Sequence, residues 1–299
     1  MKFFKKNYKL FVSLICLVLI SFYVLCFGIK KILKHEVYSK PNSQTKIYTV
    51  WHTETFEGGG KSRSIYLKKI ISAIEKENKD VLFVFVEIKP ENLESMLKNS
   101  QPDIISFGYG VGKILLTHLK SFSECYGVRD SFIESGSFSN KVYALPFMAG
   151  GYAKFEHNSH NPFIYGANNF TDATKGFSDE MTKYESQYLA YKEFVNNKNV
   201  SLVGTSRDLF RVCNLNNLGR INARITPLDN YTDLIQYIGI TNSDKITNKF
   251  VEMACKTNQQ SLCDYSLFGV QNNKLYSSDI YNDMENAIFK AKIPNCFDD

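Results

Sequence analysis

The chain has one tryptophan and seven cysteines among 299 residues, and no two cysteines have the CxxC spacing of zinc ribbons or dithiol redox sites. It also lacks the HExxH helix, the Gly-x-Ser-x-Gly nucleophile elbow, a complete P-loop motif and the dinucleotide-binding glycine fingerprint. We therefore predict a protein that is not an enzyme and has no cofactor, metal or catalytic residues. A hydrolase whose groups come from distant parts of the chain is the remaining enzymatic alternative.

The chain lacks an excess of positive charge outside the N-terminus, although the formal net charge is +6. No acidic residue precedes Glu36 and seven of the 36 basic residues do, so the rest of the chain has 29 basic and 30 acidic side chains. A nearly neutral body lacks the basic surface that nucleic-acid binding requires. We therefore expect no nucleic-acid partner.

Charge is absent from one long apolar run, which begins at Leu10 and ends at Ile29. A helix of about 20 residues spans about 30 Å of hydrocarbon. Lysines flank the run on both sides. Residues 10–29 are therefore predicted to be a single transmembrane anchor.

This anchor implies a cytoplasmic basic tail at residues 1–9 and a tether at residues 30–45. The folded body is then expected to be extracytoplasmic and held at the cell membrane. A cleaved signal peptide or a lipid-modified Cys26 are the alternatives. The side chains before Cys26, including Leu25, are bulky where both kinds of cleavage site need small residues, so the uncleaved anchor is favoured.

Five cysteines remain in the body, an odd number that leaves at least one thiol free. Cys255 and Cys263 are close enough in sequence to form a disulfide if their geometry allows it. The alternative is that all five are unpaired thiols in the folded interior.

Residues 46–63 organise the body, because they combine an apolar strand that ends at Trp51, a polar loop with glycines at 58–60, and the start of a helix. In an open α/β sheet, ligands bind at the loops that leave the carboxyl ends of the strands. The bare amides of three glycines could hold an anion, but Glu54 and Glu57 would repel it. The loop is therefore predicted to be a flexible lip beside the ligand.

Helix and strand patterns alternate after this loop. Apolar residues at helical spacing, from Leu67 to Ile74, precede residues 81–86, which are apolar on both faces as in a central parallel strand. A short helix at Pro90 and a strand at 104–107 follow. The order β-α-β-α-β implies an α/β fold with doubly wound parallel sheets.

The second half of the chain predicts more elements of both kinds. Strands are expected at residues 141–147, 152–155, 200–203, 221–227 and 234–240, and helices after Gly204, at 246–254 and at 281–288. Residues 158–179, which are rich in Asn, His, Gly and Ser, are predicted to be loop. A further helix is predicted from one apolar face formed by Met181, Tyr184, Tyr188, Tyr191 and Val195.

Taken in order, these segments resemble the extracellular solute-binding proteins of ABC importers. The first lobe is represented by IYTVWHTETFEGGG, VLFVFVEI and QPDIISFG, and the crossover by NKVYALPFMAGGYAKFEHN. The second lobe is represented by FVNNKNVSLVGTSRDLFR, and the return by YTDLIQYIGI and LCDYSLFGV. The resemblance covers about residues 46–281 and implies a two-lobed type 2 periplasmic-binding-protein-like fold.

The resemblance also implies a first lobe of residues 46–146 plus 231–266 and a second lobe of 147–230 plus 267–299. Only residues 158–197 separate the crossover from the Gly-Thr segment, so a reduced second lobe is expected. The implied function is capture of a small solute by hinge closure, with carbohydrate as one candidate, and delivery to an ABC permease. The alternative is a membrane-anchored interaction or sensor protein on a degenerate scaffold, without a transport role.

Side chains near the strand ends and crossovers are the candidate ligand contacts. They are Trp51, Glu54, Gly108, Tyr109, Arg207, Asp208 and Tyr231. Two of them have strong structural alternatives, because Trp51 could fill a core and Asp208 could pair with Arg211 on the same helix. A metal site is disfavoured, because its possible ligands match no common spacing; these ligands are His52, Glu54, His157 and His160.

Overall fold

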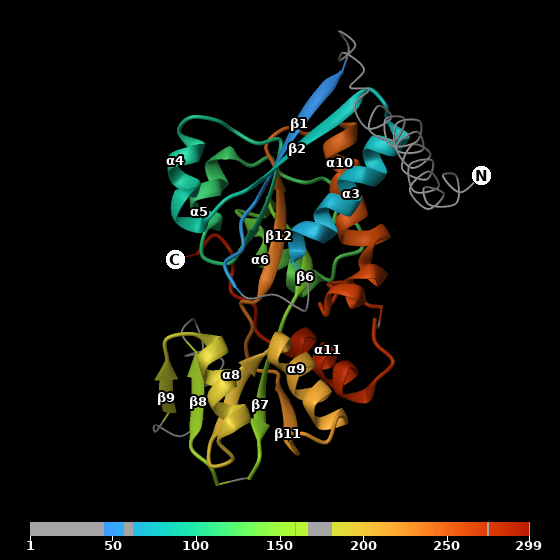
Figure 1. Cartoon of the computed structure of the whole chain (residues 1–299). Helices are drawn as coiled ribbons and strands as arrows, with labels where there is room; N and C mark the ends of the chain where they lie inside the picture. Colours follow the sequence, from blue (N-terminus) through green and yellow to red (C-terminus); the bar gives the residue numbers. More distant parts are fainter. Residues whose placement is uncertain (1–44, 57–61, 159, 167–180, 274, 299) are drawn as a thin grey trace, which may run out of the picture. The chain divides into compact units, whose positions relative to one another are not determined.

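Two five-stranded sheets carry the fold of the computed structural model (Figure 1). The structure describes residues 45–56, 62–158, 160–166, 181–273 and 275–298. The strand order is β2-β1-β3-β12-β6 in the first sheet and β11-β7-β10-β8-β9 in the second. The α/β class predicted from the sequence is confirmed.

The first sheet contains β1 (Lys46–His52), β2 (Val81–Glu87), β3 (Ile104–Gly108), β6 (Leu145–Ala149) and β12 (Ile235–Ile240). β1 and β3 are parallel, whereas β12 is antiparallel to both of its neighbours, β3 and β6. The β12–β6 register shifts beside Pro146, which lacks the N–H that a regular ladder needs. The sheet is therefore mixed, with its parallel β1–β3 pair extended by an antiparallel strand from much later in the sequence.

Helices and turns of this part of the chain follow the predicted alternation. The helices are α3 (Arg63–Glu77), α4 (Leu93–Leu97), α5 (Gly112–Leu115), α6 (Asp130–Ser135) and α10 (Lys245–Glu252). 3-10 turns lie at Pro90–Asn92, Leu116–His118 and Gln259–Tyr265, and a π-helical turn lies at Met253–Thr257. β4 (Ser137–Phe138) and β5 (Lys141–Val142) form a small hairpin. α3 buries its predicted apolar face, from Leu67 to Ile74. Ser62 caps its first turn by accepting a hydrogen bond from the Ser64 N–H.

The second sheet contains β7 (Tyr152–Glu156), β8 (Phe163–Gly166), β9 (Met181–Tyr184), β10 (Ser201–Thr205) and β11 (Arg224–Leu228). β7 is antiparallel to β10 and β11, whereas β8 is parallel to β10 and β9. Its helices are α8 (Gln187–Asn196), α9 (Ser206–Asn217) and α11 (Asp279–Lys290). α8 and α9 pack on β10, and α11 packs on β11 (Figure 1).

The strand predicted at residues 81–86 is an edge strand, so its predicted central position is wrong. Leu82 and Val84 of β2 are 46% and 48% exposed. β12, which is distant in sequence, occupies the interior position instead. One free N–H of the edge strand is satisfied by a side chain, because Phe83 N donates to Glu75 Oε1 at 2.8 Å.

Three other local predictions are also wrong. The single strand expected at residues 141–147 is two strands, β5 and β6, in different sheets. β8 falls inside the predicted loop at 158–179, and Met181 and Tyr184 lie on β9 rather than on a helix. β8 is held by pairing with β10 and β9, and β9 by pairing with β8. Local sequence patterns do not indicate such pairing.

The strands of the two sheets are connected by two adjacent crossovers. It leaves the first sheet between β6 and β7, at Gly150 and Gly151, and returns between β11 and β12. Gly150 N donates to the Leu234 carbonyl at 2.7 Å, and the Gly150 carbonyl accepts from Thr232 Oγ1 at 2.7 Å. A Cβ at Gly150 would lie 2.9 Å from Ser206 Oγ, so the two crossovers and the start of α9 approach more closely than larger residues permit.

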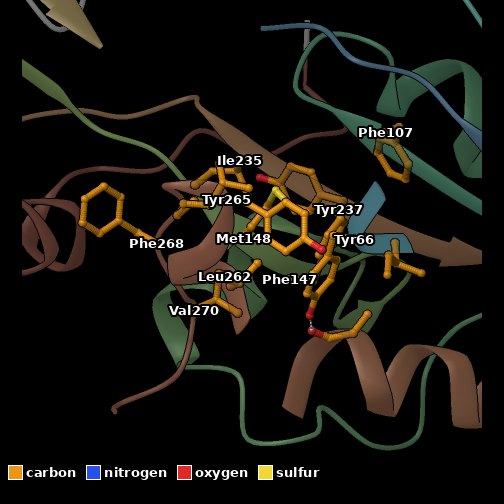
Figure 2. Close-up of a cluster of buried hydrophobic side chains, with 14 of the residues drawn as sticks. Tyr66, Phe107, Phe147, Met148, Ile235, Tyr237, Leu262, Tyr265, Phe268 and Val270 are labelled. Atoms are coloured by element: carbon orange, nitrogen blue, oxygen red, sulfur yellow. Dashed lines mark hydrogen bonds between the residues drawn. The ribbon is translucent and has the colours of Figure 1, made fainter. Parts of the chain in front are cut away.

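The interior beneath the first sheet is aromatic (Figure 2). Tyr66 of α3 stacks on Phe147 at 5.8 Å and meets Tyr265 edge-on at 5.7 Å. Its hydroxyl donates to the Ala254 carbonyl at 2.8 Å, which satisfies the polar end of a buried ring (Figure 2). Phe107 and Tyr237 stack at 5.6 Å and join β3 to β12.

The described cysteines are free thiols, so Cys255 and Cys263 do not form the disulfide that was one alternative. Cys255 and Cys296 are fully buried. No helix in the described ranges is long and apolar enough to span a membrane. The predicted anchor at residues 10–29, the tail at 1–9 and the tether before residue 45 lie outside those ranges.

Candidate functional site

The candidate site lies where β1 ends and where α3 and α9 begin. Residues 53–56 follow β1, and α3 begins at Arg63. α9 begins at Ser206, whose N–H donates to the Gly151 carbonyl at 2.8 Å. Helix N-termini and strand ends are the parts of an α/β fold that present unpaired donors to a ligand.

A chain of hydrogen-bonded side chains crosses the end of the first sheet. Gln236 of β12 donates to Ser106 Oγ at 2.9 Å and to the Thr53 carbonyl at 3.0 Å. Ser106 Oγ is 3.0 Å from His52 Nδ1, and His52 Nε2 is 3.1 Å from Glu54 Oε1. A neutral His52 satisfies this arrangement, because it accepts from Ser106 at Nδ1 and donates to Glu54 from Nε2.

Burial and neighbouring charge determine the protonation states of His52 and Glu54. Burial lowers the pKa of His52 below its ordinary value and outweighs the opposing effect of Glu54. Desolvation raises the pKa of Glu54, but the hydrogen bond with His52 and the charge of Arg63 together lower it to about 2. At pH 7 the pair is therefore a neutral imidazole beside a carboxylate.

We expect acid to destabilise the fold through His52, and His52→Gln to reduce the effect. The unfolded imidazole takes up a proton near pH 6.5 whereas the folded one does not, so the free energy of unfolding falls as the pH drops below about 6.5. Glu54 adds stability that is present above pH 4.5 and is lost as the pH falls toward 2. Urea unfolding of the full chain at a series of pH values measures both.

His118→Gln is the control for this prediction, because His118 lies on a surface turn outside the network. It should retain the parental dependence of unfolding on pH. A His52→Gln variant with the parental dependence would show that His52 is not the responsible group.

Arg63 is a fully buried cation at the first position of α3. Its Nη2 donates to the Phe56 carbonyl and lies 3.2 Å from Glu54 Oε2, and its guanidinium lies 4.1 Å from the centre of the Phe56 ring. Its Nε and Nη1 are buried and have no hydrogen-bond partner among the described residues. Burial lowers the pKa of Arg63, the charge and hydrogen bond of Glu54 oppose this shift, and the positive charge of Arg207 adds to it.

The first turn of α9 is organised by Asp208, which is fully buried. Its Oδ2 accepts from Thr205 N at 3.0 Å and from Gln187 Nε2 at 2.6 Å, and its Oδ1 lies 3.2 Å from Arg211 Nη1. Burial raises the pKa of Asp208, although these three donors oppose the shift. The carboxylate thereby ties α9 to α8 and to the end of β10.

An aromatic cluster lies at the crossovers. Tyr152, Val203, Leu228, Tyr231 and Leu234 are buried together, and Phe56, Phe163 and Tyr165 pack against them. Tyr152 donates from its hydroxyl to Asp233 Oδ1 at 2.5 Å. Phe56 belongs to the loop after β1, so this crossover cluster joins that loop to strands of the second sheet.

Several sequence-predicted site residues meet in this region. Glu54 contacts Arg63, Arg207 is near the same guanidinium, and Tyr231 belongs to the crossover cluster that Phe56 contacts. Their contact with a ligand stays a prediction.

The other predicted site residues make contacts that hold the fold together. Trp51 is 4% exposed and belongs to the core of the first sheet. Asp208 makes the predicted ion pair with Arg211. Gly108 ends β3, where a Cβ would collide with the Thr55 side chain, and Tyr109 follows it half-buried. The glycines at 58–60 lie outside the described residues.

The sequence prediction missed Arg63, Phe56 and Ser106. The available signal for Arg63 was its position, the first helical residue after a glycine-rich loop that follows a buried strand.

Within the described ranges, no three His, Cys, Asp or Glu side chains are placed to hold a metal. A cavity of about 410 Å³ adjoins the network and is lined by His52, Glu54, Ser62, Glu87, Ile88, Lys89 and Pro90.

No protein-family model and no curated protein sequence matches the chain. Solved structures do match it. The galacto-N-biose/lacto-N-biose I-binding protein of an ABC transporter from Bifidobacterium longum has a TM-score of 0.60 at 11% identity, over 86% of this chain and 89% of that one. Iron-bound HitA from Pseudomonas aeruginosa has a TM-score of 0.55 at 10% identity, over 80% of this chain and 92% of that one.

Thiaminase I from Bacillus thiaminolyticus also matches, with a TM-score of 0.59 at 9% identity over 83% of this chain and 94% of that one. Identities this low establish a shared fold and leave function open. The chain thus has the type 2 periplasmic-binding-protein-like fold, as the sequence resemblance implied. Both binding proteins and an enzyme use this fold.

Proposed function

We propose that this protein is a membrane-anchored, extracytoplasmic solute-binding protein of an ABC import system. It would capture a small solute by hinge closure and release it unchanged to a permease. The anchor would be residues 10–29, and the body would face away from the cytoplasm. A carbohydrate is one candidate solute, because several binding proteins of this fold take sugars.

The observation that best supports the proposal is the joining of polar and aromatic groups from both sheets at the crossovers. Phe56 and Arg63 come from the part of the chain that builds the first sheet, and Arg207 and Tyr152 from the part that builds the second. A hinge between the sheets would change the spacing of these groups, which is what capture by closure requires. Glu54, Arg207 and Tyr231 are our proposed ligand contacts, with Trp51, Gly108, Tyr109 and Asp208 supporting them.

A ligand panel tests the proposal. We expect one small solute, among sugars, peptides, polyamines and oxyanions, to raise the thermal midpoint of the full chain. At 100-fold over Kd, a bound solute adds about 2.7 kcal/mol to the free energy of unfolding. The solute should be recovered chemically unchanged by mass spectrometry, since no chemistry is proposed. Absence of any shift would favour the alternative, an interaction or sensor protein.

A further inference from the structure

Arg63 is the feature that the fold alone does not explain. A guanidinium has five N–H donors. Only Nη2 has acceptors, so the donors on Nε and Nη1 are buried without a hydrogen-bond partner among the described residues. Burying an ionised donor without an acceptor is costly, and native interiors rarely leave such a group unsatisfied.

The groups around Arg63 leave its positive charge only partly balanced. Glu54 is 40% exposed, so solvent screens part of its charge, and it approaches Nη2 only. Arg207 contributes positive charge that disfavours the Arg63 cation. The amide end of α3, at whose first position Arg63 lies, adds the positive pole of a 15-residue helix.

Two other polar side chains, which belong to the same end of the first sheet as Glu54, also have an atom that no described residue satisfies. Thr53 Oγ1 and Gln236 Oε1 are buried and have no partner within the described ranges. Gln236 donates to the backbone carbonyl of Thr53, so its side chain reaches the strand end from which the Glu54 loop departs. A ligand that presents both an oxyanion and a hydroxyl group would satisfy these atoms together with Arg63.

From this arrangement, and resting on the proposed function, we infer that the solute carries an oxyanion group, a carboxylate or a phosphate, which accepts hydrogen bonds from Arg63. The anion would take the donors on Nε and Nη1 that no described residue satisfies. Arg207 would contribute charge from the start of α9, so that closure brings a second cation toward the same group. Charge-assisted hydrogen bonds of this kind are the strong ones in solute recognition.

Matched neutral and anionic probes test the inference on the full chain by calorimetry. The pairs are glucose against glucose 6-phosphate and glucuronate, and succinamide against succinate, with inorganic phosphate alone as a further probe. We expect the anionic member of at least one pair to bind and its neutral member not to bind. Glucose 6-phosphate against glucuronate then separates phosphate from carboxylate recognition.

Variants assign the binding to Arg63. Arg63→Gln should weaken binding of the anionic probe roughly 10- to 100-fold, as expected for a hydrogen bond to a charged group. Arg63→Lys keeps the charge without the planar guanidinium, so its affinity for the anionic probe should lie between those of the parent and of Arg63→Gln. Arg224→Gln is the matched control, because it removes an exposed cation on β11 and should change the affinity less than twofold.

Each result bears on one of the two proposals. Neutral probes that bind equally well in Arg63→Gln overturn the oxyanion inference and leave solute binding intact. Anion binding that Arg63→Gln leaves unchanged, together with a lower thermal midpoint in that variant, makes Arg63 a structural residue and also overturns it. Failure of these probes and of the whole ligand panel contradicts the proposed function as well.

Discussion

Replacing Asp208 by alanine should lower the free energy of unfolding by about 3 to 4 kcal/mol. The substitution leaves the Thr205 N–H, whose bond to Asp208 belongs to the capping box of α9, and the Gln187 amide without their acceptor, at about 1 to 3 kcal/mol for each buried donor. Relief from burying the carboxylate offsets part of this loss. Urea unfolding of the full chain, followed by circular dichroism, measures the change.

Two further variants distinguish the contributions at Asp208. Asp208→Asn keeps one oxygen acceptor and should lose less than alanine does. Arg211→Gln removes the ion pair while leaving both buried donors satisfied, and we expect it to cost about 1 kcal/mol or less, because Arg211 is itself 25% exposed. An alanine variant within about 1 kcal/mol of the parent would contradict the capping role.

Phe194→Ala should cost about 3 to 5 kcal/mol, the usual range for emptying a fully buried phenylalanine site. The ring of Phe194 stacks on His157 at 4.4 Å and lies 6.2 Å from Phe155, so its removal opens a cavity between α8 and the second sheet. The thermal midpoint and urea midpoint of the full chain should both fall.

Tyr188→Ala is the matched control on the same helix. The sequence pattern assigns Tyr188 to the apolar face, but the structure leaves it 53% exposed and buries Gln187, Ala190 and Phe194 instead. We expect Tyr188→Ala to cost less than about 1 kcal/mol. If Tyr188→Ala cost more than Phe194→Ala, the face predicted from the sequence would be the buried one.

Elements with strong local signals were predictable. Residues 47–51 are mostly apolar and precede a polar loop, and they lie in β1 as expected. Gly204 and Thr205 precede a helix whose third residue is Asp208, and α9 begins at Ser206 with that carboxylate bonded to the Thr205 N–H. In both cases the residues that determine the element are within a few positions of one another.

Features that depend on distant pairing were not predictable from local patterns. The apolar β2 looks like a central strand but lies at the edge, and the interior place beside β3 is taken by β12, which enters the sheet more than 140 residues later along the chain. β8 has only four residues and is held by β10 and β9. No sequence pattern within residues 158–166 indicates that β8 pairs with β10 and β9.

Part of the candidate site was predictable in the same sense. Loop position indicated Glu54 and Arg207, both of which lie near Arg63. The importance of Arg63 depends on its burial and on the donors that no described residue satisfies, and both depend on tertiary packing rather than on local sequence. Trp51 was chosen for its rarity, but the size of an indole suits a core equally well, and Trp51 is buried there.

The place of β12 also sets an order of assembly during translation. β12 lies between β3 and β6, yet it is synthesised after all five strands of the second sheet. A nascent chain that has emerged as far as Leu228 can complete the second sheet, whereas β3 and β6 still lack the strand that joins them. The sheet whose first strands are made earliest is therefore completed last, and the apolar edges of β3 and β6 stay unpaired with each other's common neighbour until β12 emerges.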